Sequence, residues 1–584
     1  MIISDYFLLI NFSYQHCFYI INFSVKIKKI TQRRRIYLNI AYKKRIIILF
    51  ILLSISILSI FPYFFNNYIF SQDDLIFHRT RLENYTQAIR HWDFFPRVFP
   101  TMGLNFGYAA DLFYPSILLL PFALFRIVGF AFVPSYYMYQ VLISFITATT
   151  AYYFLYSIKR SEKLALVFSC LYTLSSYRLI DQSVRGALGE TLAFAFLPLF
   201  VLGVYSLFYT DKHRWQLLAV GMSLLIASHL ITALYSFVFL ILFILVNWKK
   251  CHQTQITGLI QAGFLTIGLS AWFLFPYLEQ VNHLTFNFSN TTLWPSGLNF
   301  SLANLLINSI ANVSAPFTEL KPNIGLLLIV FVIISGIHFR HLTSVNKRLM
   351  WVTFLMIILA TNLFPWGLFK VSILAKIQFP WRLLLFATFF ASLLATSLIE
   401  QFRLLSTKNV LLIIAISSFL TLGFNVNNLV QSTTQNNITV TNKNFSDFYE
   451  SEIGHGKEYL VKDTDFKKYF AAPGLFIDGI PYASSPNQIN NDYNHSTYTV
   501  QLNRTQEVQL PKFYYKGYEV IVNRKVVNSY NKNGLVTVTL GSGVHSIDIF
   551  YKKTMIQKVS VLFSLFSLGI LILKNRMNKR RLSK

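Results

Sequence analysis

Long apolar runs recur along most of the chain and constrain its fold more than any other feature. Each run is about 17–25 residues long, the length that a helix needs to cross the hydrocarbon core of a bilayer. Of the 584 residues, 54% are hydrophobic and only 13% are charged, too little charge to cover the surface of a soluble protein of this size. The sequence therefore predicts a polytopic α-helical membrane protein.

Twelve membrane spans are predicted from the apolar runs that separate charged clusters. They lie near residues 46–65, 134–157, 164–178, 191–209, 215–231, 233–248, 256–275, 323–339, 348–365, 382–400, 409–427 and 554–573. Nine Lys and Arg residues fall between Lys26 and Arg45, and six more fall between Lys574 and Lys584. The positive-inside rule places both clusters, and hence both termini, in the cytoplasm. Contact with the lipid bilayer explains the net charge of +28, so no nucleic acid partner is expected.

The segment Tyr114–Phe130 decides the topology of everything that follows it. If this segment crossed the membrane, the later Lys and Arg clusters would all face outward, against the positive-inside rule. A juxtamembrane helix over 114–130 is therefore preferred to a thirteenth span. With that topology, nine of the thirteen Asp and Glu residues that precede residue 430 lie on the outer side. Acid–base chemistry is accordingly expected at the outer face.

A different sequence character begins near residue 428. The stretches YTVQL, YEVIV, VTVTL and HSIDIFY alternate apolar and polar residues, which predicts strands of a β-rich, sandwich-like exterior domain. Between the last strands, NKNG (Asn531–Gly534) and GSG (Gly541–Gly543) are typical of hairpin turns. The predicted domains are a basic cytoplasmic segment (1–45), a transmembrane domain (46–427) with a large first outer loop (66–133), the β-rich domain (428–553), a final span (554–573) and a basic tail (574–584).

The first candidate site follows the first span in the stretch SQDDLIFHRTRLENY. On a helix, Asp74 and His78 lie one turn apart on the same face, and Arg81 follows. Adjacent carboxylates at a membrane surface repel one another, so Asp73 or Asp74 is a candidate base with a raised pKa. Capping of a helix N-terminus is an equally good explanation for two acids at this point.

Three further groups of polar residues are predicted at outer ends of spans. The stretch YRLIDQSVRGALGE carries Arg178, Asp181, Arg185 and Glu190; SHLITA carries His229; and KVSILAKIQFPWR carries Lys376 and Arg382. Charges near bilayer depth are costly and often line a polar cavity, although ion pairing among them is the simpler explanation. Lipid phosphate is a suitable ligand for outer cations, with headgroup anchoring as the alternative.

These stretches, together with LNFGYAADLFYP and the ending LPKFYYKGYEVIVNRKVVNSYNKNGLVTVTLGSGVHSIDIFYKKT, resemble one bacterial membrane-protein family. It is labelled 6-pyruvoyl-tetrahydropterin-synthase-related and is akin to the YfhO-like proteins; the resemblance runs from about Ser71 to Thr554. Nothing in the chain resembles the histidine zinc site of the enzyme in that label. The architecture resembles the GT-C membrane glycosyltransferases, which use sugars carried on polyprenyl phosphate.

The resemblance implies an inverting glycosyltransferase in the plasma membrane of a bacterium. Its outer-loop acid would be Asp73 or Asp74, with Asp74 preferred, and its phosphate-binding cations would be Arg185, Lys376 or Arg382. The implied partners are a polyprenyl-phosphate-linked sugar and a cell-envelope acceptor, either a polysaccharide or teichoic acid. No metal ligands are predicted, although a divalent cation is left open as a cofactor. A lipid or polysaccharide transporter and a non-catalytic envelope-assembly protein are the alternatives.

Overall fold

The structure of the chain is a computed structural model that describes most of its residues. The described ranges are 42–70, 73–210, 214–290, 292–313, 320–370, 373–434, 439–447, 450–454, 456–462, 464–482 and 489–583. The predicted basic segment 1–45 lies outside these ranges except for its last four residues. All contacts discussed below lie within the compact unit Ile55–Lys584.

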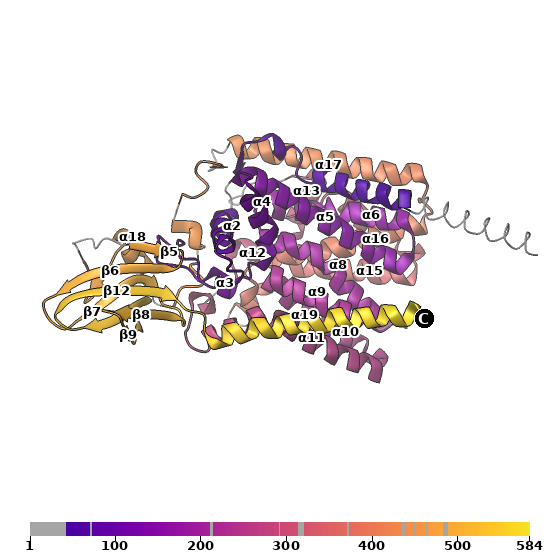
Figure 1. Ribbon diagram of the computed structural model, residues 1–584. Coiled ribbons are helices and arrows are strands. Elements are labelled where there is room, and N and C mark those ends of the chain that lie inside the picture. The colour runs from indigo at the N-terminus through magenta and orange to yellow at the C-terminus, as the bar shows by residue number, and fades with distance from the viewer. Residues whose placement is uncertain are drawn as a thin grey trace, which may run out of the picture. The chain divides into compact units, whose positions relative to one another are not determined.

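Helices make up most of the described chain (Figure 1). A first helix covers residues 42–58. The further helices include α2 Leu75–Arg90, α3 Ala110–Phe113, α4 Leu120–Val128, α5 Phe132–Lys159, α6 Glu162–Thr173, α7 Ser176–Leu179, η3 Ile180–Val184, α8 Leu188–Tyr209, α9 Trp215–Ser228, α10 Leu230–Val246, α11 Gln253–Val281, α13 Leu302–Ala311, α14 Leu326–Ile337, α15 Ser344–Ala360, η9 Ile373–Ile377, η10 Pro380–Leu383, α16 Leu384–Gln401, α17 Thr407–Thr434, α18 Phe466–Ala471 and α19 Met555–Ser583.

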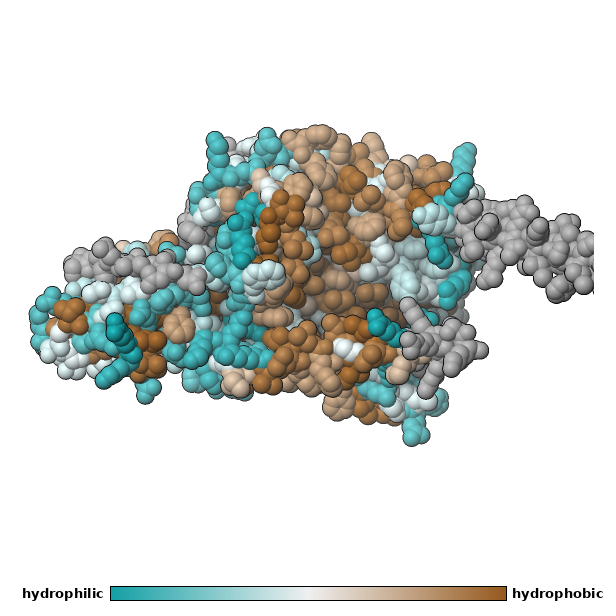
Figure 2. Space-filling view, in the orientation of Figure 1, coloured by the Kyte–Doolittle hydropathy of each residue, from teal (hydrophilic) through white to brown (hydrophobic). Residues whose placement is uncertain are grey.

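Six helical segments in the described ranges are long and apolar enough to cross a membrane. They are Phe132–Lys159, Leu188–Tyr209, Gln253–Val281, Pro380–Gln401, Thr407–Thr434 and Met555–Lys574. Large apolar side chains such as Leu562 and Phe566 are exposed on α19, and Figure 2 shows hydrophobic side chains over the helical surface. This agrees with the predicted polytopic class, because lipid can cover such a surface. The count of twelve spans stays a prediction, since several other apolar helices are shorter.

Glycine lets helices α8 and α9 approach each other closely. A Cβ atom added to Gly221 of α9 would lie 2.6 Å from both the backbone N and the Cα of Phe200 in α8. Gly203 of α8 has the same relation to the backbone of Leu218 in α9. Small residues at such crossings allow backbones to pack directly, which is the usual way of joining helices where the hydrophobic effect cannot drive association.

The C-terminal part of the chain forms two five-stranded sheets. One has the strand order β10-β11-β7-β3-β4 and the other has the order β5-β6-β12-β8-β9. The strands are β3 Phe476–Ile477, β4 Ile480–Pro481, β5 Ile489–Asp492, β6 His495–Leu502, β7 Gln506–Phe513, β8 Tyr518–Val522, β9 Lys525–Val527, β10 Tyr530–Lys532, β11 Leu535–Leu540 and β12 Gly543–Tyr551. In Figure 1 they lie together in orange and yellow. A β-rich C-terminal region is thereby confirmed.

The two sheets share one apolar core, which explains the alternating sequence pattern. Val500 of β6 and Ile549 of β12 come from one sheet, and Val508 of β7 and Val538 of β11 come from the other; all belong to a single buried cluster. Because successive side chains of a strand point to opposite faces, the apolar half of each pattern meets the facing sheet.

The two predicted hairpin turns have different outcomes. The turn at Asn533–Gly534 joins β10 to β11 as an antiparallel pair, and both residues have positive φ angles of 52° and 86°. This is the hairpin that an Asn-Gly pair favours. The GSG turn, Gly541–Gly543, instead joins β11 to β12, which belong to different sheets. The prediction of a hairpin at GSG was wrong, because local turn chemistry does not determine which strand pairs with which.

A small third sheet and several side chains tie the segments after the first helix to the C-terminal region. Strand β1, Tyr68–Phe70, pairs antiparallel with β2, Thr439–Thr441. The amide of Phe513 donates to the carbonyl of Phe106 over 2.9 Å, and Gln280 of α11 exchanges two hydrogen bonds with the backbone of Lys516. The C-terminal region is therefore joined both to the loop that follows α2 and to α11.

Replacement of Gly221 by valine should lower the melting temperature of the detergent-solubilised chain. The new side chain must displace the backbone of α8, which costs about 1–3 kcal/mol or more. Gly263→Val in α11 is the matched control, because no atom lies within 4 Å of its added Cβ while the helix propensity changes equally. Equal melting temperatures for the two variants would contradict the close approach of α8 and α9.

Candidate functional site

Arg185 lies at the centre of a cluster of four carboxylates that we call the Arg185 cluster. Its members are Asp73, Asp74, Asp181, Glu190, Arg185 and Arg382. The guanidinium donates from Nε to Asp73 (2.7 Å), from Nη1 to Asp181 (2.8 Å) and Glu190 (3.0 Å), and from Nη2 to Asp74 (3.1 Å). The Arg185 side chain is only 1% exposed. Charge-assisted hydrogen bonds of this kind are strong, and in a buried site they fix the geometry of every member.

The local backbone brings Arg185 to the start of α2. Helix α7 runs into a π-helical turn, η3, and then into Gly186, which has a φ of 63°. A Cβ atom on Gly186 would lie 2.6 Å from the Cβ of Leu75, so a larger residue would push the two segments apart. The amide of Asp74 donates to the carbonyl of Arg185 over 3.1 Å. Backbone and side chains therefore join the same two segments.

The two aspartates do not cap the helix with their side chains. Asp74 occupies the N-cap position of α2, but its carboxylate makes no capping hydrogen bond. Asp73, with a φ of 43°, is in the left-handed region that few non-glycine residues adopt. Both carboxylates are instead directed to Arg185, so helix capping does not explain the acidic pair.

Arg382 adds a second cation to the cluster. Its Nε lies 2.9 Å from Glu190 Oε1, and its Nη1 donates to Gln378 over 2.7 Å. Two aromatic residues complete this side: the ring of Trp381 lies 4.8 Å from the Arg185 guanidinium carbon, and the Tyr177 hydroxyl donates to Glu190 over 3.1 Å. Arg185 and Glu190 of the predicted stretch 177–190 are thus brought together with Arg382 of the stretch 370–382.

Burial and charge together raise the pKa of Asp73 to about 7. Removal from water is the largest cause and the charge of Asp74 is the second, while the charge of Arg185 opposes both. Full ionisation of the four carboxylates against two guanidiniums would leave an excess of two negative charges. Such an excess is costly in a buried site, so a proton retained near neutral pH is the physically expected outcome.

The rings of two histidines lie near the ring of Tyr114. The ring of His78 is 5.5 Å from that of Tyr114, and the ring of His229 is 6.4 Å from it. His229 Nδ1 is 2.8 Å from the Thr232 hydroxyl. Burial, followed by the charge of Arg81, lowers the pKa of His78 well below its usual value, so this ring is neutral. It can accept or donate a hydrogen bond but adds no positive charge.

Three other predicted site residues contact groups outside the cluster. Arg81 stacks on the ring of Tyr114 at 4.2 Å and donates to Ser116 and to the carbonyls of residues 114 and 115. Arg178 donates to Gln182 (2.9 Å), Ser144 (2.9 Å) and the carbonyl of Thr173 (3.1 Å). Lys376 of η9 donates to the carbonyl of Ser289. No ion pair joins these three to the cluster within the described part of the chain.

Several residues of the site were not singled out in the sequence. Tyr177, Gln378 and Trp381 stand inside stretches that carry predicted site residues, whereas Tyr114 does not, and none of the four is charged. The spacing of Gln378 and Arg382 was the one available signal, because residues four apart meet on a helical turn. The contacts of Tyr114 with both histidines depend on chain segments far apart in sequence.

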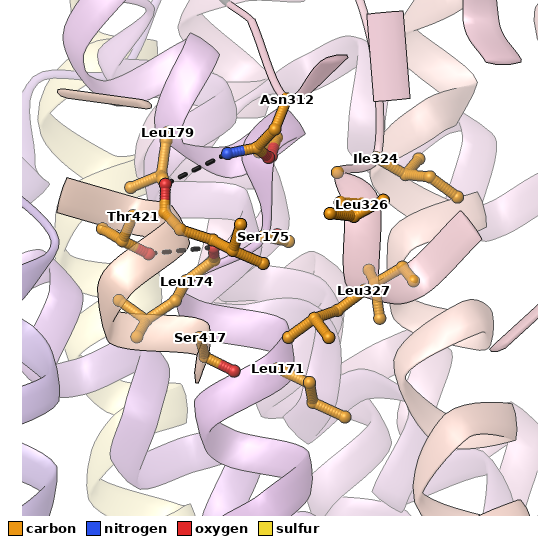
Figure 3. Close-up of a pocket in the computed structure, with 14 residues that line it drawn as sticks. Leu171, Leu174, Ser175, Leu179, Asn312, Ile324, Leu326, Leu327, Ser417 and Thr421 are labelled. Carbon is orange, nitrogen blue, oxygen red and sulfur yellow. Dashed lines mark hydrogen bonds between the residues drawn. The ribbon is translucent and has the colours of Figure 1, made fainter. Parts of the chain in front are cut away.

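One pocket has no residue of the Arg185 cluster in its lining. It is lined by residues of α6, α7, α14 and α17, among them Leu171, Ser175, Asn312 and Thr421 (Figure 3). Asn312 donates to the carbonyl of Leu420 over 3.0 Å, and Ser176 donates to Asn312 over 2.8 Å. Its polar groups are largely paired with one another, so this pocket offers few free groups for chemistry.

The residues of the cluster suit ion pairing better than metal binding. Across the described ranges, no group of three or more His, Cys, Asp or Glu side chains has the arrangement of a metal site. The four carboxylates that could hold a divalent cation instead surround a guanidinium.

Comparison with known proteins gives weak similarities. No family model matches the chain. An uncharacterised protein of Lactococcus lactis subsp. cremoris (strain MG1363) is 25% identical over 334 residues, which are 54% of each chain. Among solved structures, the mycobacterial arabinofuranosyltransferase AftD matches with a TM-score of 0.38 and 17% identity, over 65% of this chain and 27% of AftD. The chain thus spans about half of the Lactococcus lactis protein and about a quarter of AftD. The GT-C-like fold and the resemblance to the YfhO-like family stay predictions.

Replacement of Arg185 by methionine should destabilise the chain strongly. Four carboxylates, three of them buried, would lose their common partner, a loss of about 3–5 kcal/mol for a broken buried pair. The melting temperature should fall further at pH 8 than at pH 6, because Asp73 is ionised above its pKa of about 7. Lys159→Met is the control, since its pair with Glu400 is exposed and such pairs contribute about 0–1 kcal/mol. Similar melting temperatures for the two variants would show that the cluster is not a stabilising centre.

Proposed function

We propose that the chain is a membrane glycosyltransferase that moves a sugar from a polyprenyl-phosphate carrier to a cell-envelope acceptor, a polysaccharide or teichoic acid, at the outer face of the plasma membrane. The observation that carries this proposal is the Arg185 cluster, which joins an acidic pair to two arginines at one site. Acceptor activation needs a carboxylate base, and departure of a lipid phosphate needs cations. Both kinds of group meet here.

The acidic pair acts as one base. The Asp74 side chain is 39% exposed and that of Asp73 is 8% exposed, so Asp74 is the carboxylate that an acceptor hydroxyl can reach. Asp73 is the better proton holder, because its pKa of about 7 is close to the working pH. Asp74 therefore accepts the hydroxyl proton, and the pair retains it on Asp73. Arg185 holds the two carboxylates in one fixed arrangement.

Arg382 is the best-placed cation for the donor phosphate. Four of the five N–H groups of Arg185 are already directed to carboxylates. Arg382 contacts only Glu190 among the cluster carboxylates, and its side chain is 9% exposed. Lys376, six residues earlier, is a second candidate, because an ammonium can reach a phosphate from a distance as a point charge.

The reaction is a single displacement. The acceptor oxygen forms a bond to the anomeric carbon, the bond from that carbon to the phosphate oxygen breaks, and the hydroxyl proton moves to the acidic pair. The leaving polyprenyl phosphate keeps the electron pair of the broken bond, and Arg382 stabilises its charge. One displacement inverts the configuration of the anomeric carbon.

The double replacement Asp73→Asn and Asp74→Asn should abolish transfer. General-base catalysis contributes about 10²–10⁴-fold, so activity in membranes supplied with a polyprenyl-phosphate sugar should fall by at least the lower figure. Asp93→Asn is the control, because Asp93 is an acid at the end of the same helix that pairs with Lys553 and not with the cluster. If the double variant restored envelope glycosylation in a deletion strain, a transport or assembly role would replace the enzymatic one.

The transfer rate should rise with pH around neutrality. Below pH 7 Asp73 already holds a proton and cannot take another; above pH 7 it is ionised and the pair can act as the base. The acidic limb of the kcat/KM profile should therefore lie near pH 7. Asp73→Asn should lower the rate and remove that limb. A wild-type profile that is flat from pH 5 to pH 9 would rule out Asp73 as the proton holder.

A further inference from the structure

A small cavity lies beside the start of α2. Its lining includes Leu75 and Gly186, which are sequence neighbours of Asp74 and Arg185 respectively, together with Tyr63, Tyr136 and Gln140. Its volume is about 20 Å³. That volume exceeds the ~10–15 Å³ that one water molecule needs, so a single hydroxyl or hydroxymethyl group fits, whereas a whole sugar ring does not.

The amide of Gln140 is the unusual feature of this cavity. The side chain is 1% exposed, and neither its nitrogen nor its oxygen has a hydrogen-bond partner among the described residues. The hydroxyl of Tyr136, one turn earlier on α5, lies close enough to the amide to interact with it, but the pair lacks the distance and angle of a regular hydrogen bond. Of the buried amides in the described ranges, this is the one with both donor and acceptor unpartnered. Burying such a group costs free energy unless a ligand completes it.

The polar side chains around Gln140 are hydrogen-bonded to one another. Ser144 accepts hydrogen bonds from Arg178 (2.9 Å) and from the amide nitrogen of Gln182 (3.0 Å). The amide oxygen of Gln182, which also lines the cavity, accepts from Arg178 over 2.9 Å. This network gives Arg178 a positioning role: it holds one glutamine in place while the other stays available.

We infer that this cavity binds one hydroxyl-bearing substituent of the transferred sugar, and that the Gln140 amide recognises its hydroxyl group. A hydroxyl group donates one hydrogen bond and accepts another, which matches an amide that offers one acceptor and one donor. An anion fits less well, because no cationic side chain is among the lining residues. A hydrocarbon chain fits less well too, because it would leave the amide unpartnered. The inference rests on the proposed function, since it takes the adjacent acidic pair as the place of transfer.

The test is an equilibrium binding measurement that involves no transfer. Saturation-transfer difference NMR would follow methyl glycosides of hexoses, pentoses and N-acetylhexosamines, at millimolar concentration, with the full chain in nanodiscs. At least one glycoside should bind the wild type, and Gln140→Leu should weaken its binding about tenfold, the loss expected for one or two hydrogen bonds. Gln255→Leu is the matched control, because Gln255 is also buried but its amide donates to the carbonyl of Leu207.

A thermal melt separates the inference from a purely structural role of Gln140. Removal of an unpartnered amide should leave the melting temperature of Gln140→Leu equal to or above that of the wild type, whereas Gln255→Leu should melt lower. Ser183→Val, which narrows the cavity from η3, should weaken glycoside binding in the same way.

Three results would overturn the inference. The first is that no glycoside binds the wild type, and the second is that Gln140→Leu binds glycosides as the wild type does. The third is that Gln140→Leu melts at a lower temperature with binding unchanged, which would mean that a bound water satisfies the hydrogen bonds of the amide. The proposed function fails separately. If the doubly substituted acidic pair still transfers sugar while glycoside binding requires Gln140, the function is wrong and the inference about the cavity stands.

Discussion

The shared ion pairing of Arg185 is the interaction on which the rest of the site depends. One guanidinium joins the start of α2, the π-helical turn η3 and the start of α8, three segments that are separated by more than a hundred residues at the widest. Apolar residues of similar volume would join these segments at least as well, because buried ions lose their hydration. Keeping charges buried here costs free energy, and a catalytic role would explain why the chain keeps them. For this reason we place the reaction at the Arg185 cluster.

The two large sheets stabilise the loop that follows α2. Lys512 of β7 donates to the carbonyl of Asn105, and Phe513 contacts Phe106 through both its backbone and its ring. Gln280 of α11 holds the backbone of Lys516. The sandwich is therefore joined to this loop and to α11, and it contributes no residue to the Arg185 cluster.

The sequence was informative where a pattern is local and uninformative where a contact is long-range. Alternation identified the strands of the sandwich, and the Asn533–Gly534 pair identified its hairpin, because both depend on neighbouring residues. Unusual charges near the ends of apolar runs identified Asp73 and Arg185 as site candidates. The partner of each charge could not be read in the same way: Arg178 stands in the same stretch as Arg185, yet it faces a neutral network. Pairing depends on helix packing, and no spacing rule encodes it.

Because one guanidinium serves four carboxylates, these five positions cannot vary independently over evolution. A change at Asp181 alters the charge that Arg185 must balance, and thereby alters the effect of any change at Glu190 or at the acidic pair. Effects of substitution in such a network are strongly non-additive. Homologues should therefore keep the set whole or replace several members together, and the order in which substitutions arise will decide which descendants still fold.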